Sequence, residues 1–124
     1  MIAKRQKILL VDDEAIVVDV TGAMLKQFGY DVLVATSGPE AIALYQTHQD
    51  ETDLVILDLF MPGMDGSVTY DHLKTIDPHV RVILSSGYTL DDQSQSLIDR
   101  GCNGFIQKPF DLNTLAQKIR DVLD

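Results

Sequence analysis

The segment from Asp53 to Gly66 constrains the fold more than any other part of the sequence. Its apolar run, Leu54 to Leu57, leads directly into the carboxylate Asp58, and Pro62 and Gly63 follow shortly after. A short, β-branched run closed by a Pro-Gly pair is typical of a strand buried on both faces, as in parallel sheets. Asp58 would then stand at the carboxyl end of the strand, where such sheets bind their ligands. The segment predicts a parallel sheet with a candidate reactive acid at its edge, although an Asp that caps a loop would give the same pattern.

Strand-like and helix-like segments alternate along the whole chain. The expected strands are Ile8–Val11, Val32–Ala35, Leu54–Leu57, Val80 with Val82–Leu84, and Gly104–Ile106. The first expected helix stops at Gly29 and carries an apolar stripe of Val17, Val20, Met24 and Phe28. The other expected helices are Ser37–Gln46, Gly66–Ile76, Thr89–Arg100 and one that begins near Asp111. This alternation predicts a doubly wound α/β fold, in which helices cover both faces of a five-stranded parallel sheet through right-handed crossovers. Periodicity does not fix the strand order, and two doubly wound orders compete.

The amino-acid composition limits which partners and which cellular compartment the chain can have. The 124 residues include 10 basic and 19 acidic side chains, a formal net charge of −9, which disfavours contact with nucleic acid. The single cysteine, Cys102, excludes an internal disulfide and suits a reducing compartment. The run at Ile8–Val11 is too short for a signal-peptide core, and no stretch approaches the length of a membrane span. We expect a single domain over residues 1–124 without an output domain, located in the cytoplasm and without membrane contact.

Charged and polar side chains follow four of the five expected strands. Asp12 and Asp13 come after the first, Asp58 after the third, Ser86 after the fourth and Lys108 after the fifth. If the first and third strands are neighbours, the three carboxylates meet in one crevice and repel each other unless they protonate, pair with a cation or bind a metal. Since the ligands are all oxygens, Mg²⁺ fits best, with Mn²⁺ as the alternative. With a hydroxyl and an ammonium beside them, the set predicts phosphoryl transfer in which Asp58 is the nucleophile and forms an acyl phosphate.

Each of these side chains also has a purely structural interpretation. Ser86 can form the turn into a helix, Lys108 can be a solvated charge, and the pair Asp12-Asp13 can be favoured by the dipole of the following helix. Their joint placement at strand ends favours a functional site. We expect the three histidines to be surface residues away from this edge: His48, His72 and His79.

In its ordered set of motifs the chain resembles a response-regulator receiver domain, and the resemblance covers essentially the whole chain. The motifs are Asp12-Asp13, the segment from Asp58 to Gly66, Ser86-Gly87 and the segment from Phe105 to Phe110, and the spacing from hydroxyl to lysine, 108 − 86 = 22 residues, also matches. The resemblance implies a flavodoxin-like sandwich with strand order 2-1-3-4-5. It also implies two-component, or phosphorelay, signal transduction by a phosphoacceptor switch rather than by an enzyme.

The resemblance implies a role for each residue of the acidic site. Asp58 matches the phosphoacceptor, which receives its phosphoryl group from a sensor histidine kinase or a histidine phosphotransfer protein. Asp13 and Asp58 match Mg²⁺ ligands, Asp12 acts through metal-bound water, and Phe60 supplies its backbone carbonyl. Lys108 matches the phosphoryl-binding cation, and its bond to Pro109 is often cis in this family.

The resemblance also implies a conformational switch. Ser86 matches the hydroxyl that moves to bond the phosphoryl oxygen, and Phe105 matches the aromatic that rotates inward behind it. The switched face is formed by the fourth helix, the fifth strand and the fifth helix, and it would contact an effector, an attached domain or a second copy of the chain. Phe105 lacks the hydroxyl of the commoner Tyr, so the switch must work by packing. The run Ser86-Gly87-Tyr88 resembles receivers attached to hybrid sensor kinases.

Two aromatic side chains flank the path along which water would attack the acyl phosphate. Phe60 lies two residues after the acceptor, and Tyr88 lies two residues after the switch serine. Both should exclude water. The sequence therefore predicts slow self-dephosphorylation, which Phe60→Asn together with Tyr88→Glu would accelerate.

Other function classes fit the sequence less well. A Mg²⁺-dependent aspartyl phosphatase of the haloacid-dehalogenase kind needs a second Asp where this chain has Phe60. The intact acidic site and Lys108 argue against a pseudo-receiver without chemistry. A flavodoxin-like binding module would carry a phosphate loop rich in Gly, Ser and Thr after the first strand, and this chain has none.

Overall fold

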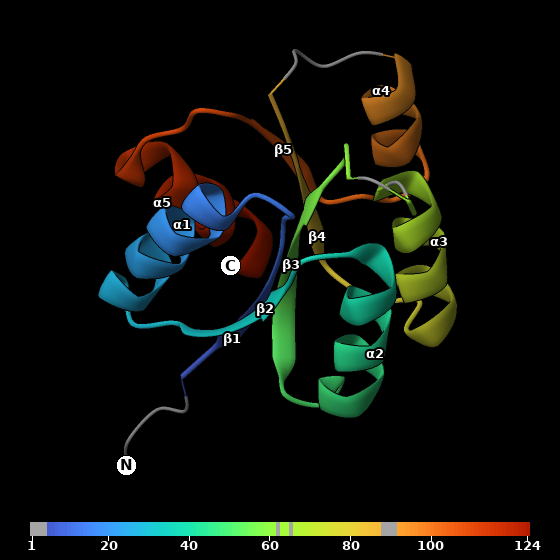
Figure 1. Ribbon diagram of the computed structural model, residues 1–124, viewed down its shortest axis with the longest axis horizontal. Coiled ribbons are helices and arrows are strands. Elements are labelled where there is room, and N and C mark those ends of the chain that lie inside the picture. The colour runs from blue at the N-terminus through green and yellow to red at the C-terminus, as the bar shows by residue number, and fades with distance from the viewer. Residues whose placement is uncertain (1–4, 62, 65, 88–91) are drawn as a thin grey trace.

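The elements of the chain alternate strand and helix from end to end. The computed structural model describes residues 5–61, 63–64, 66–87 and 92–124 (Figure 1). Its elements are β1 (Lys7–Val11), α1 (Ala15–Gln27), β2 (Asp31–Ala35), α2 (Gly38–His48), β3 (Thr52–Asp58), α3 (Gly66–Ile76), β4 (Val82–Ser86), α4 (Asp92–Asp99), β5 (Gly104–Gln107) and α5 (Leu112–Leu123). All pairings are parallel and the strand order is β2-β1-β3-β4-β5. The doubly wound fold and the order 2-1-3-4-5 are confirmed.

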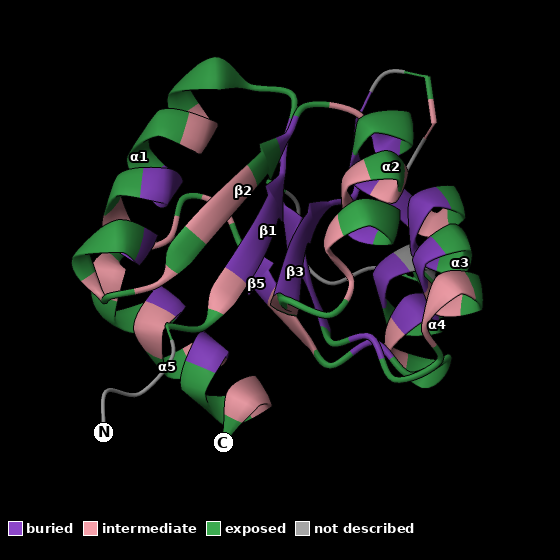
Figure 2. Ribbon diagram, turned by 90° about the horizontal axis from the view of Figure 1, so that it is seen from below, coloured by how far each residue is buried: buried purple, intermediate pink, exposed green. Residues whose placement is uncertain are grey.

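Helices cover both faces of the sheet, and each face has its own core. α1 and α5 lie on one side, and α2, α3 and α4 lie on the other (Figure 1). β3 supplies both cores, because its side chains alternate between the faces: Leu54 and Ile56 belong to the α1–α5 core, and Val55 and Leu57 to the other. Figure 2 shows the central strands as the most deeply buried part of the molecule. Within the described residues, no helix combines the length and apolarity needed to cross a membrane.

Local signals explain where several helices begin and end. Ser37 caps α2 by accepting a hydrogen bond from the Glu40 backbone N–H, and Asp111 caps α5 in the same way through Thr114. Gly29 and Gly101 follow α1 and α4 with φ of +92° and +113°, a conformation that favours glycine.

Two expected boundaries were wrong. Val80 is buried but precedes β4, since its N–H donates to Asp77 in the turn that follows α3. α4 ends at Asp99 rather than Arg100 and is described only from Asp92. The expected cap, Thr89, lies outside the described residues.

The apolar stripe expected on α1 was wrong at Val20. The buried face of α1 carries Thr21 and Leu25, whereas Val20 is 51% exposed and Ile16 is 78% exposed. α1 has apolar side chains around most of its circumference, so periodicity alone did not identify its buried face. The remaining members of the expected stripe are half-buried: Val17, Met24 and Phe28.

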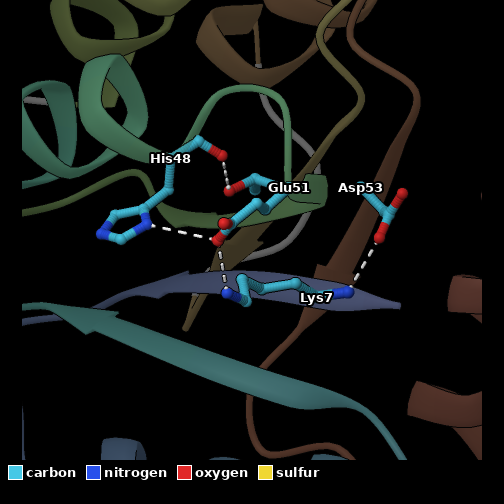
Figure 3. A network of polar contacts seen from close by, with 5 residues as sticks. Lys7, His48, Glu51 and Asp53 are labelled. Atoms are coloured by element: carbon cyan, nitrogen blue, oxygen red, sulfur yellow. Dashed lines mark hydrogen bonds and ion pairs between the residues drawn. The ribbon is translucent and has the colours of Figure 1, made fainter. Parts of the chain in front are cut away.

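A polar network joins β1 to the start of β3 at the amino edge of the sheet (Figure 3). Lys7 donates from Nζ to Glu51 and from its backbone N to Asp53, each at 2.8 Å, and Nδ1 of His48 lies 3.4 Å from the same Glu51 oxygen. The hydrogen bond from Lys7, followed by that from His48, holds the pKa of the Glu51 carboxyl below its usual value. His72 and His79 are exposed.

Two buried tyrosines allow the contribution of a hydrogen-bonded hydroxyl to the stability of the protein to be measured. Tyr45 donates to Asp77 Oδ2 at 3.0 Å, whereas the hydroxyl of Tyr70, a residue only 1% exposed, has no hydrogen-bond partner among the described residues. Tyr45→Phe should lower the free energy of unfolding by about 1 kcal/mol, because a hydrogen bond is lost. Tyr70→Phe should leave it unchanged or raise it by up to about 1 kcal/mol, because an unsatisfied polar group is removed. Urea unfolding measures both, and equal destabilisation by the two variants would contradict the prediction.

Candidate functional site

Three carboxylates converge at the carboxyl edge of the sheet. Asp12 follows β1, Asp58 ends the neighbouring β3, and one oxygen from each of these and from Asp13 lies within 4.8 Å of the others. Asp12 and Asp58 are 2% and 3% exposed, whereas Asp13 is exposed to solvent. The adjacency of β1 and β3 therefore brings together residues 46 positions apart, 58 − 12 = 46.

The ammonium of Lys108 lies between two of these carboxylates. Its Nζ is 2.6 Å from Asp12 Oδ2 and 3.5 Å from Asp58 Oδ2. Its backbone N–H donates to the Ser86 carbonyl at 2.7 Å, and its bond to Pro109 is cis. Burial by itself would lower the pKa of the Lys108 ammonium, but the hydrogen bond to Asp12 and the nearby negative charges raise it overall. Lys108 is therefore a charged group that partly neutralises the acidic cluster.

The environment of Asp58 disfavours its ionised form. Burial raises the pKa of this carboxyl from 3.8 to about 6, against the charge of Lys108 and with a further contribution from Asp12. The backbone N–H of Phe60 donates to its Oδ1 at 3.2 Å. The carboxylate is thus held in place by a backbone hydrogen bond while burial opposes its charge.

Gly66 lets the loop after β3 fold back onto the end of that strand. A Cβ at this position would lie 2.6 Å from the Leu59 Cα and 2.9 Å from the Asp58 carbonyl oxygen. The Gly66 N–H donates to the Leu59 carbonyl at 2.9 Å. This close approach fixes the backbone immediately after the acidic residue.

The other expected site residues lie around the same edge. Ser86 ends β4 and is 1% exposed. Phe105 on β5 is half-buried and packs against the core on the side of α2, α3 and α4. Phe60 is 43% exposed. Tyr88 lies outside the described residues, so slow self-dephosphorylation stays a prediction.

A pocket over Asp58 contains a residue that sequence reasoning missed. The pocket has a volume of about 450 Å³ and is lined by Glu14, Asp58, Phe60, Gly87 and Lys108. Glu14 precedes α1, and the sequence analysis gave it no role. The signal that could have found it is its position directly after Asp12-Asp13, where it shares their sheet edge.

An apolar groove adjoins this pocket. The groove has a volume of about 210 Å³, and Lys108 borders both cavities. Its walls come from α1 and from the segment after β5: Ile16, Val17, Val20, Thr21, Met24, Lys108, Pro109 and Phe110. The sequence reasoning missed the groove because it assigned Val20 to the core.

The donor set suits a hard divalent cation. The three converging groups are all carboxylates, and oxygen ligands select Mg²⁺ or Mn²⁺ over zinc. Two buried acids and one exposed acid at the switch point of a doubly wound sheet, with a lysine beside them, have the chemistry that a cation-assisted phosphoryl site needs.

Comparison with known proteins agrees with this class. The family model for the response regulator receiver domain matches residues 8–120. The chain is 35% identical over 117 residues to sensor kinase CckA of Brucella abortus, covering 94% of this chain and 12% of the relative. It is 30% identical over 118 residues to sporulation initiation phosphotransferase F of Bacillus subtilis, covering 95% of this chain and 94% of the relative. The chain therefore belongs to the response regulator receiver domain family.

Solved structures give the same result. The receiver domain of the hybrid histidine kinase CckA matches with a TM-score of 0.80 and 32% identity, covering 95% of this chain and 99% of that chain. A chain in the CheX–CheY–BeF₃–Mg²⁺ complex from Borrelia burgdorferi matches with a TM-score of 0.91 and 28% identity, covering 96% and 90%.

Family membership assigns the chain to two-component, phosphorelay signal transduction, and the phosphatase alternative is not favoured. Receiver domains bind Mg²⁺ in an acidic pocket and interact with histidine kinases or phosphotransfer proteins. The chain spans only part of some curated relatives: 12% of CckA and about half, 49%, of the probable transcriptional regulator ycf27 of Porphyridium aerugineum.

The raised pKa of Asp58 predicts a pH-dependent cost to stability in the metal-free protein. Since the folded pKa lies above the ordinary value of 3.8, the cost begins as pH rises through that value and is complete above about 6. Asp58→Asn should therefore stabilise the protein in EDTA at neutral pH by about 3 kcal/mol, because each unit of the shift corresponds to about 1.4 kcal/mol.

Urea unfolding between about pH 5 and pH 7.5 measures this effect. The difference in the free energy of unfolding between Asp58→Asn and wild type should widen up to about pH 6.5 and then stay constant. Asp19→Asn, an exposed acid on α1, is the control and should show no such gap. A gap for Asp58→Asn that does not depend on pH would contradict the prediction.

Proposed function

We propose that Asp58 accepts a phosphoryl group from a sensor histidine kinase or a histidine phosphotransfer protein. The observation that carries the proposal is the position of the Lys108 ammonium against Asp12 and Asp58, at the point where three carboxylates converge. Asp12, Asp13, Asp58 and the Phe60 carbonyl would hold Mg²⁺, for which Mn²⁺ could substitute.

The residues divide the work of the transfer. A carboxylate oxygen of Asp58 attacks phosphorus, the bond to the donor nitrogen breaks, and the histidine ring keeps the electron pair. Lys108 and the Ser86 hydroxyl bind the phosphoryl oxygens. The bound cation supplies neutralisation of phosphoryl charge. The chain is thus a phosphoacceptor switch, acting in the cytoplasm, that assists its own phosphorylation and dephosphorylation.

The output face comprises α4, β5 and α5. Phe105 lies on β5 opposite Leu84 of the neighbouring β4, the strand that Ser86 ends. In this proposal, movement of Ser86 towards the phosphoryl group lets Phe105 rotate inward. Phosphorylation biases this two-state face, which contacts an effector, an attached domain or a second copy of the chain.

The phosphodonor binds the apolar groove between α1 and the segment after β5. The groove adjoins the phosphorylation pocket through Lys108. Its apolar residues Ile16 and Val20 are exposed to solvent instead of being packed in either core. A helix from the donor would bury them and bring its histidine towards Asp58.

Phosphorylation itself is the first test. Wild type incubated with phosphoramidate and Mg²⁺ should gain one phosphoryl group by intact-protein mass. The adduct should be absent with EDTA and in Asp58→Asn, because it needs both the cation and the acceptor. A folded, Mg²⁺-binding wild type that takes no phosphoryl group under any condition would overturn the proposal.

The groove has a separate test. The donor is a phosphorylated histidine phosphotransfer protein that transfers its phosphoryl group to wild type. Val20→Glu should slow this transfer by a factor of at least about ten, because a buried charge opposes docking. Its rate with phosphoramidate should be unchanged. Val68→Glu, a comparably exposed apolar position on α3 (42%, against 51% for Val20), is the control and should behave as wild type. Equal slowing by both variants would overturn the assignment of the groove.

A further inference from the structure

Glu14 is fixed at the edge of the phosphorylation pocket without a structural task for its side chain. It is the N-cap residue of α1, with φ −89° and ψ 114°, and its side chain makes no capping hydrogen bond. Its backbone N–H donates to Asp12 Oδ1 at 2.9 Å. The main chain of Glu14 is thus tied to the acidic cluster while its carboxylate remains exposed.

The carboxylate of Glu14 adds a negative charge to the approach to Asp58. Both residues line the same open pocket, together with Phe60, Gly87 and Lys108. Glu14 also contributes to the negative field around the Lys108 ammonium. Together with those of Asp12, Asp13 and Asp58, four carboxylates therefore gather at this edge of the sheet beside one ammonium. A bound divalent cation offsets two of these charges and leaves the pocket negative.

We propose that Glu14 selects among phosphodonors by charge, slowing small dianionic donors more than donors of lower charge. The proposal rests on the function proposed above, with Asp58 as the acceptor. A small acyl phosphate must enter the pocket against this field with no other contact to compensate. A protein donor gains contacts in the groove that offset the repulsion, so the pocket favours phosphohistidine on a docked protein.

Two small donors differ in charge but form the same product, so a comparison of their rates shows the effect of donor charge. With acetyl phosphate, a dianion, an Asp58 oxygen bonds to phosphorus and acetate leaves with the electrons of the broken P–O bond. With phosphoramidate, a monoanion whose nitrogen is already protonated, the P–N bond breaks and ammonia leaves with the electron pair. Both reactions convert the carboxylate into the same acyl phosphate.

Coulombic repulsion is proportional to the charge of the donor, which fixes a relation between the two rates. If neutralising Glu14 raises the rate of phosphorylation by the monoanion by a certain factor, it should raise the rate with the dianion by about the square of that factor. Because the pocket is open to water, the effect should be screened by salt. A structural role for Glu14 predicts neither the square relation nor the dependence on salt.

The experiment measures phosphorylation rates of Glu14→Gln and wild type with both donors at saturating Mg²⁺, whose binding is checked by calorimetry for each protein. At low ionic strength, Glu14→Gln should be faster by about twofold with phosphoramidate and about fourfold with acetyl phosphate. Both factors should approach one at about 1 M salt. Asp19→Asn removes the same charge five residues further along the chain, on α1 and outside the pocket, and should match wild type with both donors.

Each outcome decides a different question. Equal factors for the two donors, factors that persist at high salt, or no acceleration would overturn the selective role of Glu14. Wild type that accepts phosphate from neither donor would overturn the function proposed for Asp58, and the inference with it.

Discussion

The ion pair between Lys108 and Asp12 holds the functional edge of the sheet together. It joins the segment after β5 to the end of β1, residues 96 positions apart, at 2.6 Å. Because both side chains are largely buried, loss of either partner would leave a charge without compensation in a poorly solvated place. The same ammonium reaches Asp58, so the end of β3 depends on this contact too. The acidic residues of the site can therefore be gathered before any cation binds.

Much of the fold was readable from the sequence for a physical reason. A parallel sheet that is covered on both faces needs uninterrupted apolar strands, and Leu54–Leu57 has no polar residue to disturb that pattern. The strand order was not readable in this way, because strands that are all apolar carry no signal about their neighbours. It came from the resemblance to receiver domains, and the pairing of β1 with both β2 and β3 confirms it.

The site was readable only in part. Asp12 and Lys108 stand directly after strands and Asp58 ends one. Because parallel topology collects the ends of strands at one edge, their convergence followed from position. The groove did not follow, because it depends on how α1 is rotated about its axis. Glu14 stands directly after Asp12-Asp13, but only the lining of the pocket shows that it lies beside Asp58. α1 has apolar residues on several sides, and only packing shows that Thr21 and Leu25 face inward while Ile16 and Val20 face outward. Val80 shows the same limit, since a buried apolar residue beside a strand looks like part of it.

The alternation of β3 between two cores has a consequence for how the chain finds its pairing. A shift of β3 by one residue would exchange Leu54 and Ile56 with Val55 and Leu57, and both cores would still receive apolar side chains. Hydrophobic burial therefore discriminates poorly between the two alignments, and the polar residues at the ends of the strand must decide. Asp53 accepts from the Lys7 N–H at one end, and Asp58 meets Lys108 at the other. The carboxylate proposed to accept the phosphoryl group thus also helps to fix the alignment of β3 in the sheet.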